Sequence, residues 1–81
     1  MAELKRIMHV DDDDSIRMIT SVTLESVGNL EVASCESGYI AQEKYADFQP
    51  QALLLDVMMP DLDGPGTLEA LKTQHELDDV L

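Results

Sequence analysis

Three short apolar runs alternate along the chain with longer stretches whose apolar residues recur at helical spacing. Lys5 to Val10 predicts a short strand that ends at an acidic run. Leu30 to Cys35 alternates in polarity, which is typical of a strand partly open to solvent and predicts an edge strand. Ala52 to Val57 is almost continuously apolar, as in a parallel strand that helices cover on both faces.

A first helix is predicted over residues 15–27. Asp13 or Asp14 can cap its first turn, where acidic groups also favour the positive end of the helix dipole. Gly28-Asn29 is the predicted stop, because Gly readily takes the left-handed conformation after a last turn. The positions of this helix that fall near one helical stripe are Ile16, Ile19, Val22, Thr23 and Val27.

Two more helices are predicted after the second and third apolar runs. Ser37 can cap a helix from about Gly38 to Phe48, and Pro50 ends it. Pro65 suits the first turn of a third helix, which reaches to about His75. The inward positions predicted for these two helices are Ala41, Tyr45, Phe48, Leu68 and Leu71.

The resulting β-α-β-α-β-α order predicts an α/β fold with a parallel sheet and right-handed crossovers. In an open sheet of this kind, sites form outside the carboxyl ends of the strands, where the strand order reverses. If the first and third strands are neighbours, as in a flavodoxin-like order, the reversal falls between them.

Composition limits the classes of function. At 81 residues the chain is one small domain, and its net charge of −12, from 17 acidic and 5 basic residues, disfavours nucleic acid and anionic membrane surfaces as partners. No apolar stretch approaches the roughly 20 residues of a membrane span. The single cysteine, Cys35, excludes an internal disulfide and fits a reducing compartment. We therefore expect a soluble cytoplasmic domain.

Acidic residues follow both the first and the third apolar run. Asp11 to Asp14 come directly after Val10, and Asp56 closes the third run. If these strand ends meet, several carboxylates converge at one sheet edge and call for a cation. Taken singly, the Asp run is also a typical helix cap and Asp56 a strand terminus. His9, inside the first strand, is predicted to be buried and structural.

Three pieces of the sequence, in this order, together resemble the receiver domain of two-component response regulators. They are Val10-Asp11-Asp12-Asp13 leading to Arg17, Leu55-Asp56 with Met59-Pro60, and Asp63-Gly64 opening the third helix. The resemblance covers essentially the whole chain. It implies a flavodoxin-like, doubly wound parallel sheet, of which residues 1–81 would be the N-terminal portion of a single receiver domain.

The resemblance also implies a site and a role for each of its residues. Asp56 would accept a phosphoryl group from a sensor histidine kinase or a histidine phosphotransfer protein, in a regulatory domain and not a free-standing enzyme. Mg²⁺ would be held by Asp11, Asp12, Asp56 and the backbone carbonyl of Met58. The pair Asp12/Asp13 could serve instead, but the strand end at Val10 and the spacing to Arg17 favour Asp11/Asp12.

Receiver domains usually have five strands and five helices, and this sequence departs from them by supplying three of each. The Ser/Thr and Lys that the family carries on later strands have no counterpart here. Three explanations stay open: a portion of a longer regulator, completion by a second copy through swapping or edge pairing of the third strand, and a naturally short variant. The alternative function is a receiver-like interaction module that is not phosphorylated.

Overall fold

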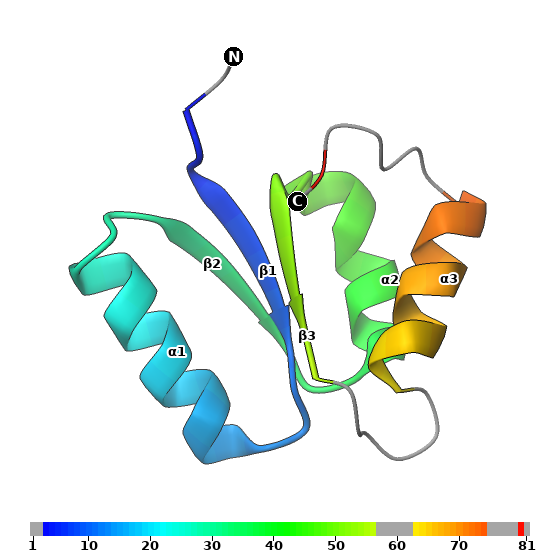
Figure 1. The fold of residues 1–81 in the computed structure, drawn as a ribbon, viewed down its shortest axis with the longest axis horizontal. Helices are drawn as coiled ribbons and strands as arrows, with labels where there is room; N and C mark the ends of the chain where they lie inside the picture. Colours follow the sequence, from blue (N-terminus) through cyan, green and yellow to red (C-terminus); the bar gives the residue numbers. More distant parts are fainter. Residues whose placement is uncertain (1–2, 57–62, 75–79, 81) are drawn as a thin grey trace.

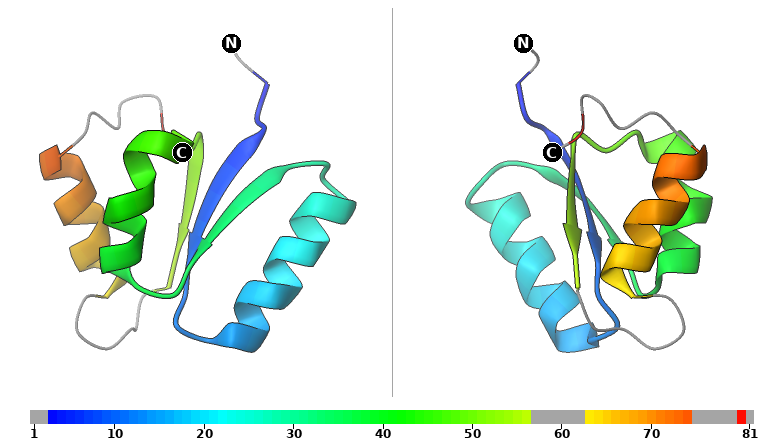
Figure 2. Two further views of the ribbon diagram at one scale, coloured as in Figure 1. Left: turned by 180° about the vertical axis from the view of Figure 1, so that it is seen from behind. Right: turned by 45° about the vertical axis from the view of Figure 1, so that its right-hand side comes forward.

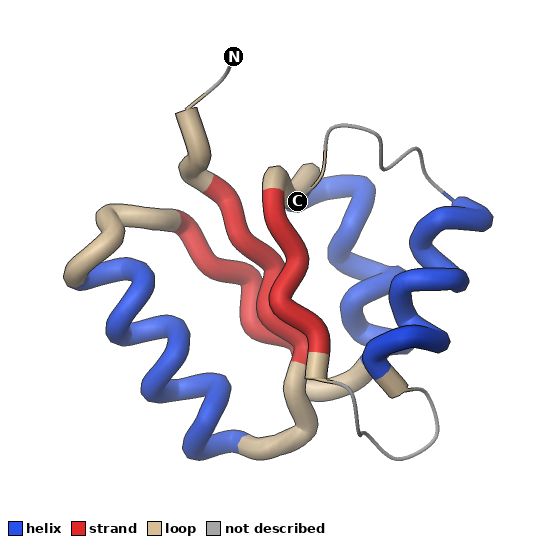
Figure 3. Tube along the Cα trace, in the orientation of Figure 1, coloured by secondary structure: helices blue, strands red, loops and turns tan. Residues whose placement is uncertain are grey.

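The structure, a computed structural model, describes residues 3–56, 63–74 and 80. Strands and helices alternate as predicted (Figures 1 and 3). Their bounds are β1 Arg6–Val10, α1 Asp14–Ser26, β2 Glu31–Cys35, α2 Gly38–Phe48, β3 Ala52–Leu55 and α3 Gly64–Gln74. The predicted ends at Val57 and His75 lie outside the described residues. No helix in the described part of the chain is long and apolar enough to cross a membrane.

The three strands form one parallel sheet in the order β2-β1-β3, with β1 in the middle (Figure 1). Val10 of β1 pairs with Cys35 on one side and with Leu55 on the other. The chain therefore passes from β1 to the strand on one side and then crosses to the other side. This confirms that the first and third strands are neighbours and that the strand order reverses between them.

The apolar core lies between the sheet and the two helices α2 and α3, which cover the same face (Figure 2). Its buried members are Met8, Val10, Cys35, Ala41, Tyr45 and Leu71. The inward stripe predicted for α2 is therefore confirmed, with Phe48 packed against the core from the rim. On the opposite face of β1, Ile7 and His9 are also buried, as a central strand requires.

Helix α1 lies on the other face of the sheet and packs mainly against β2 (Figure 2). None of its residues is buried. Its predicted apolar stripe points outward instead of into a core, with Ile16 46%, Ile19 65% and Val22 57% exposed. The side nearer the sheet carries polar groups, and the hydroxyls of Ser21 and Ser34 lie 2.6 Å apart. The helix is confirmed, and the face that contacts the sheet is not the apolar stripe.

Both ends of α1 are closed by local contacts. Asp13 is the N-cap, and its carboxylate accepts a hydrogen bond from the amide of Ile16 at 3.0 Å. At the other end Asn29, with φ 53°, takes the left-handed conformation that was expected of Gly28. Gly28 is needed for space, since a Cβ there would lie 2.9 Å from the carbonyl oxygen of Leu24.

Strand β3 is an edge of the described sheet. Helix α3 packs on one of its faces, and Leu54 on the other face is 43% exposed. The continuous apolar run is therefore only partly covered by the described residues. Among the described residues, the third strand therefore has one partner strand and one open edge.

Candidate functional site

The site lies at the carboxyl ends of β1 and β3, where the strand order reverses. Backbone hydrogen bonds continue the sheet by one residue past each strand. The amide of Asp56 donates to the carbonyl of Val10 at 2.9 Å, and the amide of Asp11 donates to the carbonyl of Cys35 at 3.0 Å. The parallel register therefore fixes the main chain of both acidic residues relative to the strands.

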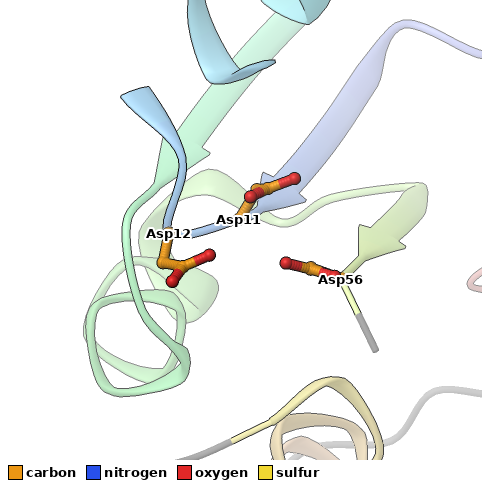
Figure 4. Close-up of side chains that lie close together, drawn as sticks. All are labelled: Asp11, Asp12 and Asp56. Atoms are coloured by element: carbon orange, nitrogen blue, oxygen red, sulfur yellow. The ribbon is translucent and has the colours of Figure 1, made fainter. Parts of the chain in front are cut away.

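Three carboxylates meet at this edge: those of Asp11, Asp12 and Asp56. One oxygen from each lies within 4.8 Å of the others. Figure 4 shows the side chains of Asp12 and Asp56 extending toward each other, with Asp11 beside them. Asp11 is buried at 7% exposure, Asp56 is half-buried and Asp12 is exposed. The cluster is thus anchored in the sheet on one side and open to water on the other.

The donor set suits a hard divalent cation. Two like charges about 4 Å apart repel each other by about 1 kcal/mol in water and about 4 kcal/mol near a protein surface, so three close carboxylates favour a compensating charge. Mg²⁺ prefers oxygen ligands and retains several waters, which the open side of this cluster can admit. The residues present therefore fit a magnesium ion.

The four residues of the Asp run are separated by the structure into different positions. Asp11 and Asp12 lie with Asp56, whereas Asp13 caps α1 and its amide donates to Oδ1 of Asp11 at 2.9 Å. Asp14 is the first residue of α1 and pairs with Arg17. The fourth predicted ligand, the backbone carbonyl of Met58, lies outside the described residues.

Two further side chains adjoin the cluster. Nε2 of His9 lies 3.8 Å from Oδ2 of Asp11, and Nη1 of Arg17 donates to the main-chain carbonyl of Asp11 at 2.7 Å. His9 is buried in β1, as its place within the first apolar run predicted, whereas the only sequence signal at Arg17 was its spacing from the acidic pair. The contact of Arg17 with the carbonyl of Asp11 could not be predicted, because it depends on how the Arg17 side chain extends from α1.

The parallel order β2-β1-β3 is that of doubly wound, flavodoxin-like α/β proteins, and the acidic cluster lies at its switch point. The family model of the response regulator receiver domain matches residues 7–81. The chain belongs to this family. It is therefore a regulatory domain of two-component phosphorelay signalling.

Individual relatives agree with this assignment. The chemotaxis protein CheY of Bacillus subtilis is 37% identical over 67 residues, covering 83% of this chain and 56% of CheY. The structure of CheY4 from Vibrio cholerae superposes with a TM-score of 0.82 at 30% identity, covering 89% of this chain and 59% of that one. TrrA of Thermotoga maritima, in complex with Mg²⁺-BeF, gives a TM-score of 0.78 at 27% identity, with coverage of 90% and 63%. The chain thus spans less than two thirds of the length of these proteins.

We predict that His9 makes the fold sensitive to acid. Burial lowers the pKa of His9 below 6.5, opposed by Asp11 and Asp56 and assisted by Arg17. As the pH falls, His9 therefore binds a proton in the unfolded chain before it does so in the folded chain. The free energy of unfolding consequently decreases as the pH falls below about 6.5. Denaturant unfolding in EDTA at pH 7.5, 6.5 and 5.5 should show a weaker pH dependence for His9→Gln than for the parent. The same change in the free energy of unfolding with pH in both proteins would contradict this prediction.

Proposed function

We propose that Asp56 is the phosphoacceptor of a Mg²⁺-dependent phosphotransfer from a phosphohistidine on a partner kinase or phosphotransfer protein. The observation that carries the proposal is the convergence of Asp11, Asp12 and Asp56 at the switch point. Asp56 is half-buried at a strand end, whose main chain is fixed by the sheet. A nucleophile held in this way needs little reorganisation before attack.

In the proposed reaction, a carboxylate oxygen of Asp56 attacks the phosphorus atom of the donor. The O–P bond forms while the N–P bond breaks, and the imidazole leaves with the electron pair of that bond. Bound Mg²⁺ would neutralise charge on the phosphoryl oxygens and on the attacking carboxylate. Asp11 and Asp12 would hold the ion with Asp56, and the carbonyl of Met58 stays a predicted ligand.

The partner is proposed to dock on the outer face of α1. This helix starts two residues after Asp12, at the end of the sheet that carries the site (Figure 1). On its first turns Ile16, Met18 and Ile19 are 46%, 64% and 65% exposed. Exposed apolar residues beside a reactive group mark an interaction surface better than scattered ones do.

We place the domain in the cytoplasm, which the free thiol of Cys35 supports.

A receiver-like interaction module without phosphorylation is the second candidate function. It is supported by the position of β3 at an edge of the described sheet, where Leu54 is exposed and another chain could pair with the strand. A second copy paired at this edge would form a homodimer. That residues 1–81 are the N-terminal portion of one receiver domain also stays a prediction.

Phosphorylation of Asp56 can be tested directly. We expect the full-length parent, incubated with acetyl phosphate and Mg²⁺, to gain the mass of one phosphoryl group and to lose this gain in EDTA, whereas residues 1–81 alone should show little stable phosphorylation. Asp56→Asn should abolish it because the amide is no nucleophile. Asp47→Asn, at an exposed position on α2, is the matched control and should behave like the parent. An unmodified parent would refute the proposal, as would a modified Asp56→Asn protein.

Docking on α1 is tested by comparing a protein phosphoryl donor, which must dock, with acetyl phosphate, which needs no docking surface. We expect Ile19→Glu to slow phosphotransfer from a phosphorylated histidine phosphotransfer protein by about tenfold, since an apolar anchor residue at an interface contributes 1–2 kcal/mol. Phosphorylation by acetyl phosphate should be unchanged. Val27→Glu, 83% exposed at the far end of α1, is the control. An equal loss with both donors would show that the substitution damages the site instead of the docking surface.

Edge pairing predicts self-association that depends on Leu54. Sedimentation over a range of concentrations should show a dimer that strengthens with added salt, because salt screens the repulsion between chains of charge −12. Leu54→Lys should weaken the dimer. Leu4→Lys is a matched control, because Leu4 is 40% exposed and precedes β1. A monomer at every concentration would rule out the homodimer.

A further inference from the structure

Arg17 connects α1 to the acidic cluster, although the phosphotransfer chemistry above does not use it. Its side chain is only 15% exposed. Nη1 donates to the main-chain carbonyl of Asp11 at 2.7 Å, while Nη2 pairs with the carboxylate of Asp14. The planar guanidinium thus uses two of its N–H directions to hold the first turn of α1 to the residue that follows β1.

The carbonyl that Arg17 binds belongs to the peptide between Asp11 and Asp12. The Asp11 side is also held by other contacts, because its amide donates to Cys35 and its Oδ1 accepts from Asp13. Asp12 is exposed, and its side chain has no hydrogen bond among the contacts of the described residues. The direction in which the side chain of Asp12 points therefore depends on the orientation of the peptide between Asp11 and Asp12.

Electrostatics alone would give Arg17 the opposite role. A guanidinium beside the cluster attracts the three carboxylates, but it also repels an incoming dication. If charge dominated, removing Arg17 would strengthen Mg²⁺ binding. If the orientation of the Asp11–Asp12 peptide dominated, removing Arg17 would weaken it. The two effects differ in sign, so one measurement separates them.

We propose that Arg17 is a positioning residue that orients the Asp11–Asp12 peptide so that the carboxylate of Asp12 faces Asp56 and the metal. The contacts favour this role over a purely electrostatic one, because the guanidinium is hydrogen-bonded to a carbonyl and to Asp14 instead of to a carboxylate of the cluster. The inference rests on the proposed Mg²⁺ site and adds a residue that is not itself a ligand.

The test is Mg²⁺ titration of the full chain, followed by the amide signals of Asp12 and Asp56 in NMR spectra. We expect Arg17→Gln to raise the dissociation constant for Mg²⁺ by about tenfold or more, as groups that orient metal ligands commonly do. Arg17→Lys should also weaken binding, because an ammonium lacks the fork that bridges the Asp11 carbonyl and Asp14.

The matched control is Arg6→Gln. Arg6 also donates to a main-chain carbonyl, that of Gln49, at 2.8 Å, but it lies at the amino end of β1. This variant makes the same change in net charge and should bind Mg²⁺ within about twofold of the parent, because the charge is remote from the site and screened.

Each outcome decides between the hypotheses. Equal or tighter binding by Arg17→Gln, with a parent that binds, overturns the positioning role and leaves the metal site intact. A parent that shows no response to millimolar Mg²⁺ refutes the proposed metal site, and the inference fails with it. If Arg17→Gln does not fold in metal-free buffer, Arg17→Lys decides, and parental affinity in that variant overturns the inference.

Discussion

The parallel pairing of β1 with β3 is the constraint on which the site depends. The hydrogen bond from the amide of Asp56 to the carbonyl of Val10 is the last rung of this ladder, and it brings the two acidic strand ends to one edge. Since side chains alternate between the faces of a strand, a shift of one residue would turn Asp56 to the other face. The apolar residues Leu53 and Leu55, which pack against the core, oppose such a shift. Core packing and site geometry are therefore set by the same register.

Much of the fold could be predicted from the sequence where burial leaves a clear pattern, as in the short apolar run of β1 and in α2, whose stripe includes Ala41 and Tyr45. Helix α1 shows the limit of this reasoning. Its apolar period was visible, but a period does not reveal which side meets the sheet, and a hydroxyl contact at Ser21 occupies the inner side. The site's carboxylates were predictable because strand ends of a parallel sheet converge. The contact between Arg17 and the carbonyl of Asp11 was not predictable in this way, because it depends on the conformation of a long side chain, which the sequence pattern does not show.

Several features of the structure reduce the repulsion that the acidic cluster creates. Helix α1 starts two residues after Asp12, and the partial positive charge of its amino end favours nearby carboxylates. Arg17 adds a full charge from within the same helix. A bound dication would provide the remaining compensation, which explains why so many acidic groups can gather at one edge of a small domain. The three close carboxylates are thus the reason that a metal is proposed at this edge.

The outer face of α1 completes this arrangement in a different way. Ile16 and Ile19 contribute little to the core, so their apolar character is not explained by folding. They lie on the first turns of a helix that starts two residues after Asp12, which is why this face is the proposed docking surface. If α1 is the docking surface and Asp56 the phosphoacceptor, as proposed, affinity for a partner and reactivity toward phosphate can vary separately, because one would depend on the helix face and the other on Asp56 and its neighbours. On the proposed roles, a few substitutions on the exposed face of α1 would change the partner, while the register between β1 and β3 would keep the acidic site unchanged.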